Sequence, residues 1–300
     1  MKAGPGLLGL RRYASRCLKL GEYLKRPGDG RMSPKIPASI LLWGLVARNL
    51  LRVRAFSAVE RLVRSRSPGL GVDGSFSDDA LAYFIERLDA DRLRDALQGV
   101  LWCAKRNKAF GGTVRLGLAL DGTGVGHSRK RSCPLCHPHR NGDGEVTGWG
   151  HKMVGASVVG DALTLPLDVE FYPPGQGELT AGKRLLERVV GRARIRFDYL
   201  VVDGLYPGAP FLALADSLGL PVVARLTQGL PELFEAAEAR FRGRPPSAVH
   251  TLGGGVVELW DAGDFEPWWG LTWPSVRVLR YRQHRKKGEV VEAYWLTNFP

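Results

Sequence analysis

The sequence is short of several residue types, and each shortage excludes a class of protein. It has only four cysteines, of which Cys17 and Cys103 stand alone. A disulfide framework of the secreted kind is therefore not expected, and a reducing cytoplasm fits better. The longest apolar run, Ala38 to Ala47, reaches only about half of what a membrane-spanning helix needs. The basic N-terminus lacks a continuous apolar stretch with a cleavage site, so no secretory signal is expected.

Acidic residues are also in short supply. The chain has 43 Lys and Arg against 30 Asp and Glu, a formal net charge of +13. A chain this basic attracts polyanions, of which nucleic acid is the usual one. A basic surface that is merely solvated is the alternative. Clusters of basic residues at 129–131, 188–196 and 281–287 favour nucleic acid, and we expect salt-dependent binding of double-stranded DNA.

The predicted elements divide the chain into four segments. Residues 1–35 are rich in glycine, arginine and proline, and we expect them to be poorly ordered. Residues 36–110 are predicted to form an Arg-rich, all-helical DNA-binding region. Residues 111–226 read as three strands followed by alternating helices and strands, which predicts a mixed α/β sheet because right-handed crossovers make the later strands parallel. Residues 227–300 are predicted to be β-rich.

Two predicted strands each end in an aspartate that is followed by a glycine. The apolar run 116–120 ends on Asp121, the run 199–202 ends on Asp203, and a glycine follows each. One such pair alone is a common turn signal. In the predicted sheet the two strands lie side by side and parallel, so both carboxylates reach the strand ends where sites form in open α/β sheets. A divalent cation relieves their repulsion, and oxygen ligands select Mg²⁺ or Mn²⁺, the ions of phosphodiester chemistry.

Several stretches between about residues 77 and 300 occur together: "SDDALAYFIERLDADRLRDAL", "LALDGTG" followed by "CPLC" and "HK", "AGKRLLERV", "YLVVDGLYP" and "AYWLTN". Together they resemble the DDE transposases of bacterial insertion sequences. The resemblance implies a ribonuclease-H-like catalytic core with a β-rich insertion, Mg²⁺ or Mn²⁺ as cofactor, and Asp121 and Asp203 as two acids of a catalytic triad. It further implies transposon-end and target DNA as partners, a homodimer on DNA, and a nucleoid location.

The family's third acid is a glutamate on a helix that follows the strand corresponding to "WLTN". That helix would begin after Pro300, so we expect a chain truncated before its third acid and nearly inactive in strand cleavage. The late acids Glu258, Asp261, Glu289 and Glu292 are interpreted as solvated strand and turn residues. Two alternatives stay open: a catalytically inactive DNA-binding transposase remnant, and another ribonuclease-H-like nuclease.

A second group of candidate ligands follows Asp121. Cys133 and Cys136 have the Cys-x-x-Cys spacing of a zinc half-site. The rest of the site has to come from His139 or His151 with one more ligand, and Cys133, Cys136 and His139 form the predicted set. Because no second Cys-x-x-Cys occurs, a reduced, loop-borne pair without zinc is favoured as the alternative.

Three basic residues are predicted to contact DNA: Lys152, at the start of the second strand, and Arg192 and Arg194 in the basic cluster at 188–196. Glu178 lies in the first turn of a predicted helix, where a carboxylate complements the helix dipole. We interpret Glu178 as structural, although a helix packed on this sheet would bring it near the aspartates.

Overall fold

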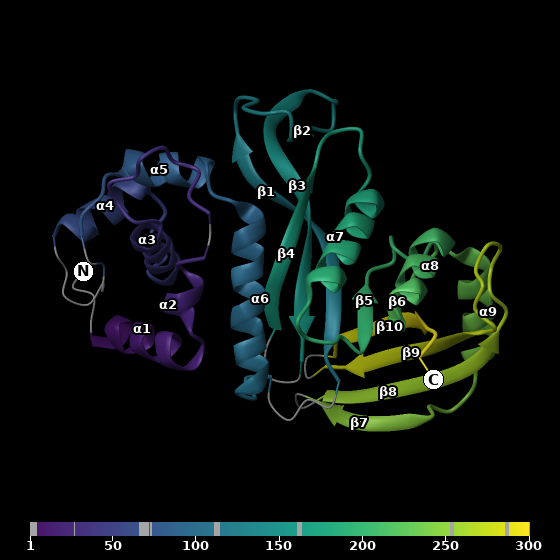
Figure 1. Cartoon of the computed structure of the whole chain (residues 1–300). Helices are drawn as coiled ribbons and strands as arrows, with labels where there is room; N and C mark the ends of the chain where they lie inside the picture. Colours follow the sequence, from purple (N-terminus) through teal and green to yellow (C-terminus); the bar gives the residue numbers. More distant parts are fainter. Residues whose placement is uncertain are drawn as a thin grey trace. The chain divides into compact units, whose positions relative to one another are not determined.

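The computed structural model describes residues 5–26, 28–65, 72, 74–110, 115–160, 164–252, 255–285 and 288–299. They form two compact units, the first comprising residues 1–111 with 192–195 and the second residues 112–191 with 196–300. The first unit is helical, and the second contains a ten-stranded sheet (Figure 1). Over the ranges described, no helix is long and apolar enough to span a membrane.

The first unit has its core among short helices. They are α1 (Pro5–Cys17), α2 (Leu20–Tyr23), α3 (Ala38–Leu50), α4 (Phe56–Arg64), α5 (Asp78–Glu86) and α6 (Ala90–Arg106). Side chains cap two of these helices at their N-termini: Ser77 Oγ accepts from the Ala80 N–H at 3.1 Å, and Asp89 caps α6. Leu41, Leu81 and Phe84 are fully buried in the core.

The N-terminal segment differs from the expectation of poor order, because it contains α1 and α2. Tyr23 of α2 is buried, and its ring lies on Gly99 of α6, where a Cβ atom would stand only 2.1 Å from the ring. Its hydroxyl lies 3.8 Å from the Cys103 Sγ. The close approach that glycine permits thus anchors α2 to α6, and composition alone gives no sign of it.

The second unit is built on one sheet. Its strands are β1 (Gly117–Ser128), β2 (Cys136–Arg140), β3 (Val146–Val159), β4 (Thr164–Tyr172), β5 (Tyr199–Val202), β6 (Val222–Leu226), β7 (Ala248–Leu252), β8 (Gly255–Phe265), β9 (Val276–His284) and β10 (Val290–Thr297). Strand order is β2-β3-β1-β5-β6-β10-β9-β8-β7, and β4 also pairs with β3. β3 runs antiparallel to β1 and β4, whereas β5 is parallel to β1 and β6. The predicted mixed α/β sheet with N-terminal helices is confirmed.

Helices connect the parallel strands of this sheet. They are α7 (Glu178–Arg192), between β4 and β5, and α8 (Ala209–Ser217), between β5 and β6. The apolar side chains of α7 at Leu185 and Leu186 are fully buried, as are Leu118 of β1 and Leu200 of β5. Arg188 on the same helix pairs with acids of β4. This packing fixes the start of α7 near the middle of β1, where the candidate site lies.

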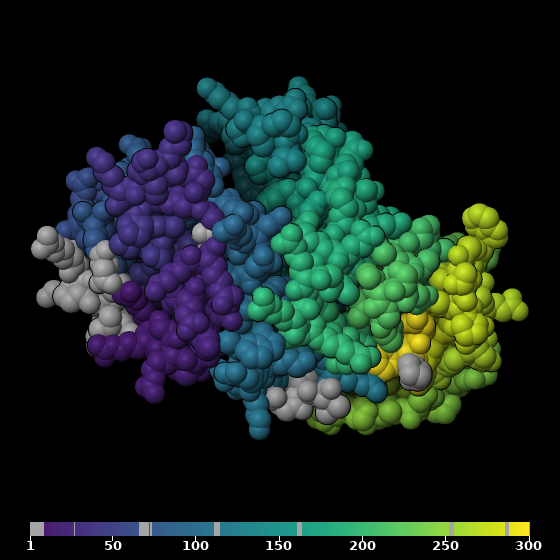
Figure 2. All heavy atoms as spheres, viewed as in Figure 1, coloured from purple at the N-terminus to yellow at the C-terminus, as the bar shows by residue number. Residues whose placement is uncertain are grey.

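The C-terminal region continues the same sheet. Helix α9 (Pro231–Phe241) precedes four strands, β7 to β10, within the segment 227–300 that was predicted to be β-rich. β10 pairs antiparallel with β6, and Asn298 Oδ1 accepts from the Val222 N–H at 2.7 Å. Strands β7 to β10, green to yellow in Figures 1 and 2, therefore extend the central sheet instead of forming a separate body.

Candidate functional site: an acidic edge and a sulfur–imidazole group

Asp121 and Asp203 come together because their strands are parallel neighbours. The last register pair between β1 and β5 joins Leu120 to Val202, and each aspartate is the next residue. Their backbones are thus about one strand spacing, ~4.8 Å, apart. Asp121 does not end its strand, however, since β1 continues to Ser128 while paired with β3. The glycine turn expected after Asp121 is extended strand.

Glu178, interpreted from the sequence as structural, lies against β1 next to the position of Asp121. Its carboxyl group lies on Gly122, the residue after Asp121, where a Cβ atom would stand 2.2 Å from the Glu178 Cδ. A Cβ atom at position 122 would therefore displace this carboxyl group from its present position. The available signal was the combination of a helix after the third strand with a glycine directly after Asp121. A third carboxylate thus reaches the same part of β1.

The Tyr206 hydroxyl interacts with all three acids, through a hydrogen bond to Glu178 and through their negative charges. Its side chain is fully buried, and its hydroxyl donates to Glu178 Oε1 at 3.0 Å. Burial raises the pKa of Tyr206 far above its usual value, and the negative charges of Glu178, Asp203 and Asp121 raise it further. All three negative charges therefore act on the same hydroxyl. Tyr206 stays protonated and keeps donating to Glu178.

Asp121, Asp203 and Glu178 together form what we call the acidic edge, and this edge is accessible to solvent. Asp121 and Asp203 are exposed, and Glu178 is half-buried. Asp203 Oδ1 accepts from the Leu205 N–H at 2.9 Å, which holds the backbone in a tight turn just after β5. Carboxylate oxygens are the ligands that Mg²⁺ and Mn²⁺ prefer, so this donor set fits those ions.

The late acids of the β-rich region have other partners. Glu292 accepts from Arg280 and Arg282, and Asp261 pairs with Arg277. Glu258 faces His284, and Glu289 pairs with Arg285. All of these contacts lie among β8, β9, β10 and the turn that precedes β10. Each of the four is thus engaged in a local pair, as expected of strand and turn residues.

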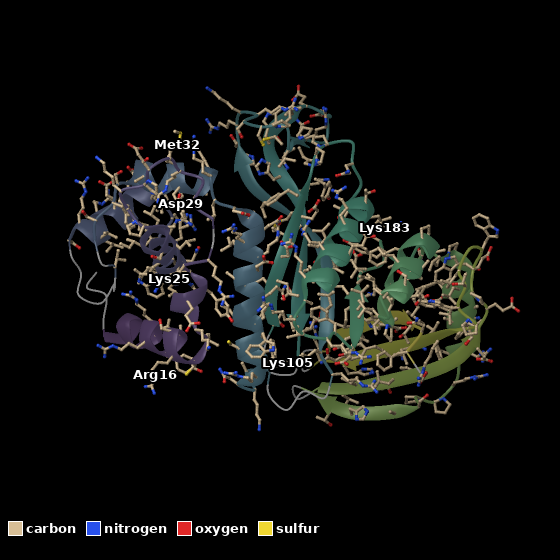
Figure 3. The ribbon with its side chains drawn as sticks, in the orientation of Figure 1. Arg16, Lys25, Asp29, Met32, Lys105 and Lys183 are labelled. Carbon is tan, nitrogen blue, oxygen red and sulfur yellow. The ribbon has the colours of Figure 1, made fainter. Side chains whose placement is uncertain are left out.

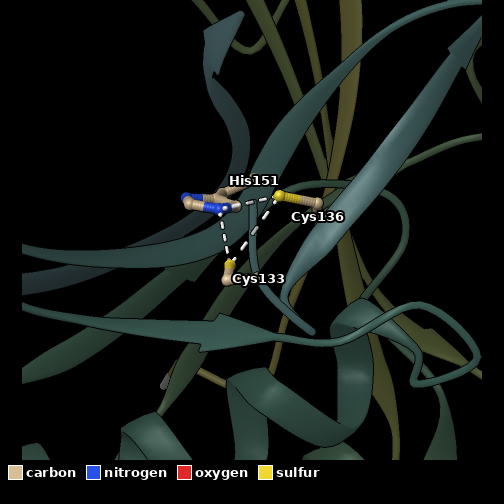
Figure 4. A group of neighbouring side chains, drawn as sticks. All are labelled: Cys133, Cys136 and His151. Atoms are coloured by element: carbon tan, nitrogen blue, oxygen red, sulfur yellow. Dashed lines mark hydrogen bonds between the residues drawn. The ribbon is translucent and has the colours of Figure 1, made fainter. Parts of the chain in front are cut away.

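A second group of candidate ligand side chains lies in the loop after β1 and on strands β2 and β3. Cys133 Sγ is 3.7 Å from Cys136 Sγ, and His151 Nε2 is 3.2 Å and 3.5 Å from these two sulfur atoms (Figure 4). Both cysteines are free thiols. A hydrogen bond from the Ser132 hydroxyl is the main cause that lowers the pKa of Cys136 to about 6. Within the described ranges this is the only set of three Cys, His, Asp or Glu ligands whose atoms all lie within 4.8 Å of one another.

His139 is not a member of this group. Its ring stacks on His127 with the centroids 5.6 Å apart, and it lies over Gly150 of β3. His151 takes its place because Cys136 and His151 are direct register partners of β2 and β3. The structure therefore joins the two predicted cysteines to the other histidine that the sequence left open.

The three predicted DNA-contacting residues have different surroundings. Lys152 is exposed on β3, and Arg194 is exposed as well. Arg192 instead pairs with Asp91 and Asp95, at 3.2 Å and 3.5 Å. Its charge is thus partly neutralised within the first unit.

The basic cluster at 188–196 is further weakened at Arg188, which pairs with Asp168 and Glu170 of β4. Burial raises the pKa of Glu170, but hydrogen bonds from Arg188 and Arg184 outweigh burial, and the pKa ends below its usual value. The four groups form a local network between α7 and β4. Arg188 is therefore better explained as a structural residue than as a phosphate ligand.

Exposed basic residues are more available on the first unit. Figure 3 labels Arg16 of α1, Lys25 after α2 and Lys105 of α6, all of which are exposed. Arg52, Arg54 and Arg61, in and before α4, are exposed too. The first unit, which contains the predicted DNA-binding region, therefore carries many exposed positive charges.

Comparisons with known proteins find little that resembles this chain. No family model matches it, and no curated protein matches it. Among solved structures, the Drosophila P element transposase strand transfer complex is similar over 75% of this chain and 47% of that chain, with 13% identity and a TM-score of 0.30. The chain spans about half the length of that neighbour. A likeness this distant carries no argument about the site.

Proposed function

We propose that this chain is a transposase that cleaves DNA and transfers its strands at the ends of an insertion sequence, using a divalent cation. One observation carries the proposal: Asp121 and Asp203 follow the last parallel register pair of β1 and β5, and the carboxyl of Glu178 lies on the residue next to Asp121. The sequence motifs that resemble DDE transposases, and the formal net charge of +13, support the same activity.

Three carboxylates from different elements make up the proposed metal site. Asp121, Asp203 and Glu178 would hold Mg²⁺ or Mn²⁺, for which oxygen ligands are suited. When bound, such ions activate a water or hydroxyl nucleophile and stabilise the leaving oxygen of a phosphodiester. The exposure of both aspartates leaves the edge accessible to a polymer substrate.

The surrounding residues of this chain position the acids. The Tyr206 hydroxyl, which stays protonated, donates to Glu178 and orients one of its oxygens. The turn that Asp203 closes with Leu205 fixes the backbone just past β5. Because Glu178 supplies a third carboxylate within residues 1–300, we expect measurable cleavage, contrary to the expectation from the motifs alone.

DNA binding is part of the proposal. The exposed arginines at 52, 54 and 61 and the exposed Lys152 and Arg194 are the proposed phosphate contacts. Each phosphate contact releases counterions, so affinity should fall steeply as salt rises. Arg188 and Arg192 should contribute less, because both are paired with acids.

A second function is favoured by the openness of the acidic edge. The ligand oxygens of Asp121, Asp203 and Glu178 are not drawn together as closely as the Cys133 group. A chain that binds element ends without cutting them would need no tighter arrangement. This alternative predicts the same DNA binding and no metal-dependent cleavage.

A nicking assay on supercoiled plasmid distinguishes the two functions. We expect the intact chain to nick DNA with Mn²⁺ or Mg²⁺ and not with EDTA. Asp121→Asn, Asp203→Asn and Glu178→Gln should each reduce the rate by about 10²-fold or more, since each removes charge from the site. The matched control is Glu187→Gln, an exposed acid on the same helix, which should leave the rate unchanged.

The DNA affinity of each variant is measured in parallel. An intact chain that binds DNA but never nicks it contradicts the enzymatic function and supports the binding function. If Glu178→Gln nicks as well as Glu187→Gln while Asp121→Asn does not, Glu178 is not the third ligand.

A further inference from the structure

We propose that Cys133, Cys136 and His151 bind one zinc ion that fastens the loop after β1 to strands β2 and β3. This site is separate from the acidic edge and does not depend on the proposed function. Its three ligand side chains come from a loop and two strands, and Figure 4 shows them converging on one point.

The distances between the ligand atoms match a zinc site. Zinc lies near 2.3 Å from sulfur and about 2.0–2.1 Å from nitrogen, so a tetrahedral site places two sulfurs about 3.8 Å apart and sulfur and nitrogen about 3.6 Å apart. Here the two sulfurs are 3.7 Å apart, and His151 Nε2 is 3.2 Å and 3.5 Å from them. A disulfide needs a separation of about 2.05 Å, so the arrangement fits a shared ion better than a bond.

Backbone structure brings the ligands to this geometry. The four residues from Cys133 to Cys136 form a turn, closed by a hydrogen bond from the Cys136 N–H to the Cys133 carbonyl at 3.2 Å. Pro134 occupies the second position of the turn, where its fixed φ is favourable. His151 faces Cys136 as its register partner on β3, and the Phe171 ring of β4 contacts the histidine edge-on. Strand pairing therefore places Cys136 and His151, and the turn places Cys133.

Zinc is the metal that this donor set favours. Two thiolates and one imidazole are soft and borderline ligands, which select zinc over Mg²⁺ or Ca²⁺. Cys136 is buried, while Cys133 and His151 are half-buried, so the ligands are largely shielded from water. No fourth Cys, His, Asp or Glu joins the group in the part of the chain that the structure describes, which leaves the fourth position to water.

The ion would order a basic loop. Arg129, Lys130 and Arg131 precede Cys133 and are exposed. Ser128 Oγ accepts from the Lys130 N–H at 3.1 Å, and the Arg131 guanidinium lies 5.6 Å from the centre of the Trp149 ring of β3. Zinc at Cys133 would add the strongest tether of this segment to β3.

The test measures metal content and ligand chemistry on the full chain. The reduced protein is loaded with Zn²⁺, dialysed, and analysed by mass spectrometry of the metal. We expect about one zinc per chain, and near-complete loss in Cys133→Ser, Cys136→Ser and His151→Ala. Two matched controls, His139→Ala and Cys17→Ser, should keep their zinc.

Cobalt substitution gives an independent readout. Co²⁺ in this site should show thiolate-to-metal charge-transfer bands and the intense d–d bands of tetrahedral coordination, and zinc should displace it. Circular dichroism of each metal-free variant establishes that it folds. Zinc that persists in the folded Cys133→Ser and Cys136→Ser variants overturns the proposal, as does an intact reduced chain that binds no zinc. Loss of zinc in His139→Ala but not in His151→Ala would show that the ligand set is wrong.

Discussion

The second unit carries two groups of candidate metal ligands, and they are built in opposite ways. In the sulfur–imidazole group of Cys133, Cys136 and His151, the ligand atoms lie 3.2–3.7 Å apart and are partly or fully buried. In the acidic edge, Asp121 and Asp203 are exposed. A compact, largely buried set of ligands suits a resident ion that stabilises the fold, whereas an exposed set suits an ion shared with a substrate.

The two groups are also close enough for one to support the other. His151 of β3 pairs with Val125 of β1, while Gly155 of β3 pairs with Asp121. Four residues of strand, about 13 Å, therefore separate the register positions of the two groups. An ion bound by Cys133, Cys136 and His151 would therefore hold the ends of β1 and β3 in place next to the acidic edge.

Removal of zinc should have the largest effect on stability. If the sulfur–imidazole group holds zinc, its binding stabilises the folded chain by about 2.7 kcal/mol when free zinc is 100-fold above its dissociation constant. Thermal unfolding of the zinc-loaded chain with and without EDTA measures this. The melting temperature should fall with EDTA and recover with Zn²⁺ but not with Mg²⁺. A Cys136→Ser chain that shows the same EDTA shift as the intact chain contradicts the assignment.

Gly122→Ala should have the next largest effect, because the new Cβ would stand 2.2 Å from the Glu178 carboxyl group. The carboxyl group can move, but moving it breaks its hydrogen bond with the buried Tyr206 hydroxyl, which should cost about 1.5–3 kcal/mol. Gly124→Ala is the matched control on the same strand, since its nearest neighbour would be 3.9 Å away. Urea unfolding compares the two variants. Equal stabilities would show that Glu178 does not lie on Gly122.

Tyr206→Phe should cost about 1.5 kcal/mol, because it removes a hydrogen bond to a charged group from a fully buried position. A double-mutant cycle with Glu178→Gln isolates the interaction between the two side chains. We expect a clear coupling energy in the unfolding free energies. Additive effects would mean that the contact contributes nothing.

Asp203→Asn should have the smallest effect on stability, within about 0.5 kcal/mol, as for most exposed positions. Asparagine keeps the side-chain oxygen that accepts from the Leu205 N–H, so the turn after β5 survives. Thermal unfolding without metal checks this. A loss of more than about 1 kcal/mol would assign Asp203 a structural role and remove the contrast with the sulfur–imidazole group.

The sequence predicted the sheet better than it predicted the sites. Apolar runs were enough to find β1 and β5, and apolar residues at helical spacing were enough to find α7, because burial dictates those patterns. The extent of β1 past Asp121 was not predictable, since it depends on pairing with β3. Glycine residues after Asp121 looked like a turn, yet Gly122 is needed for the close approach of a side chain.

It was harder to predict which residues belong to each site, because that depends on the register between strands. Cys133 and Cys136 are visible as a spacing, but His139 and His151 are equally plausible partners until β2 is aligned with β3. Glu178 was visible as a helix-start carboxylate, and only the packing of α7 over β1 brings it to Gly122. Local chemistry can thus be predicted from sequence, while the meeting of distant residues needs the fold.

Metal-directed cleavage of the backbone tests the central claim most directly, namely that Asp121, Asp203 and Glu178 hold one divalent-ion site. The zinc-loaded chain is given Fe²⁺ with ascorbate and peroxide, and the fragments are identified by mass spectrometry. The account predicts cuts near residues 121, 178 and 203 together, suppressed by excess Mg²⁺ and absent in Asp121→Asn. Cuts confined to the Cys133–His151 region, or scattered cuts that Mg²⁺ does not suppress, would contradict it.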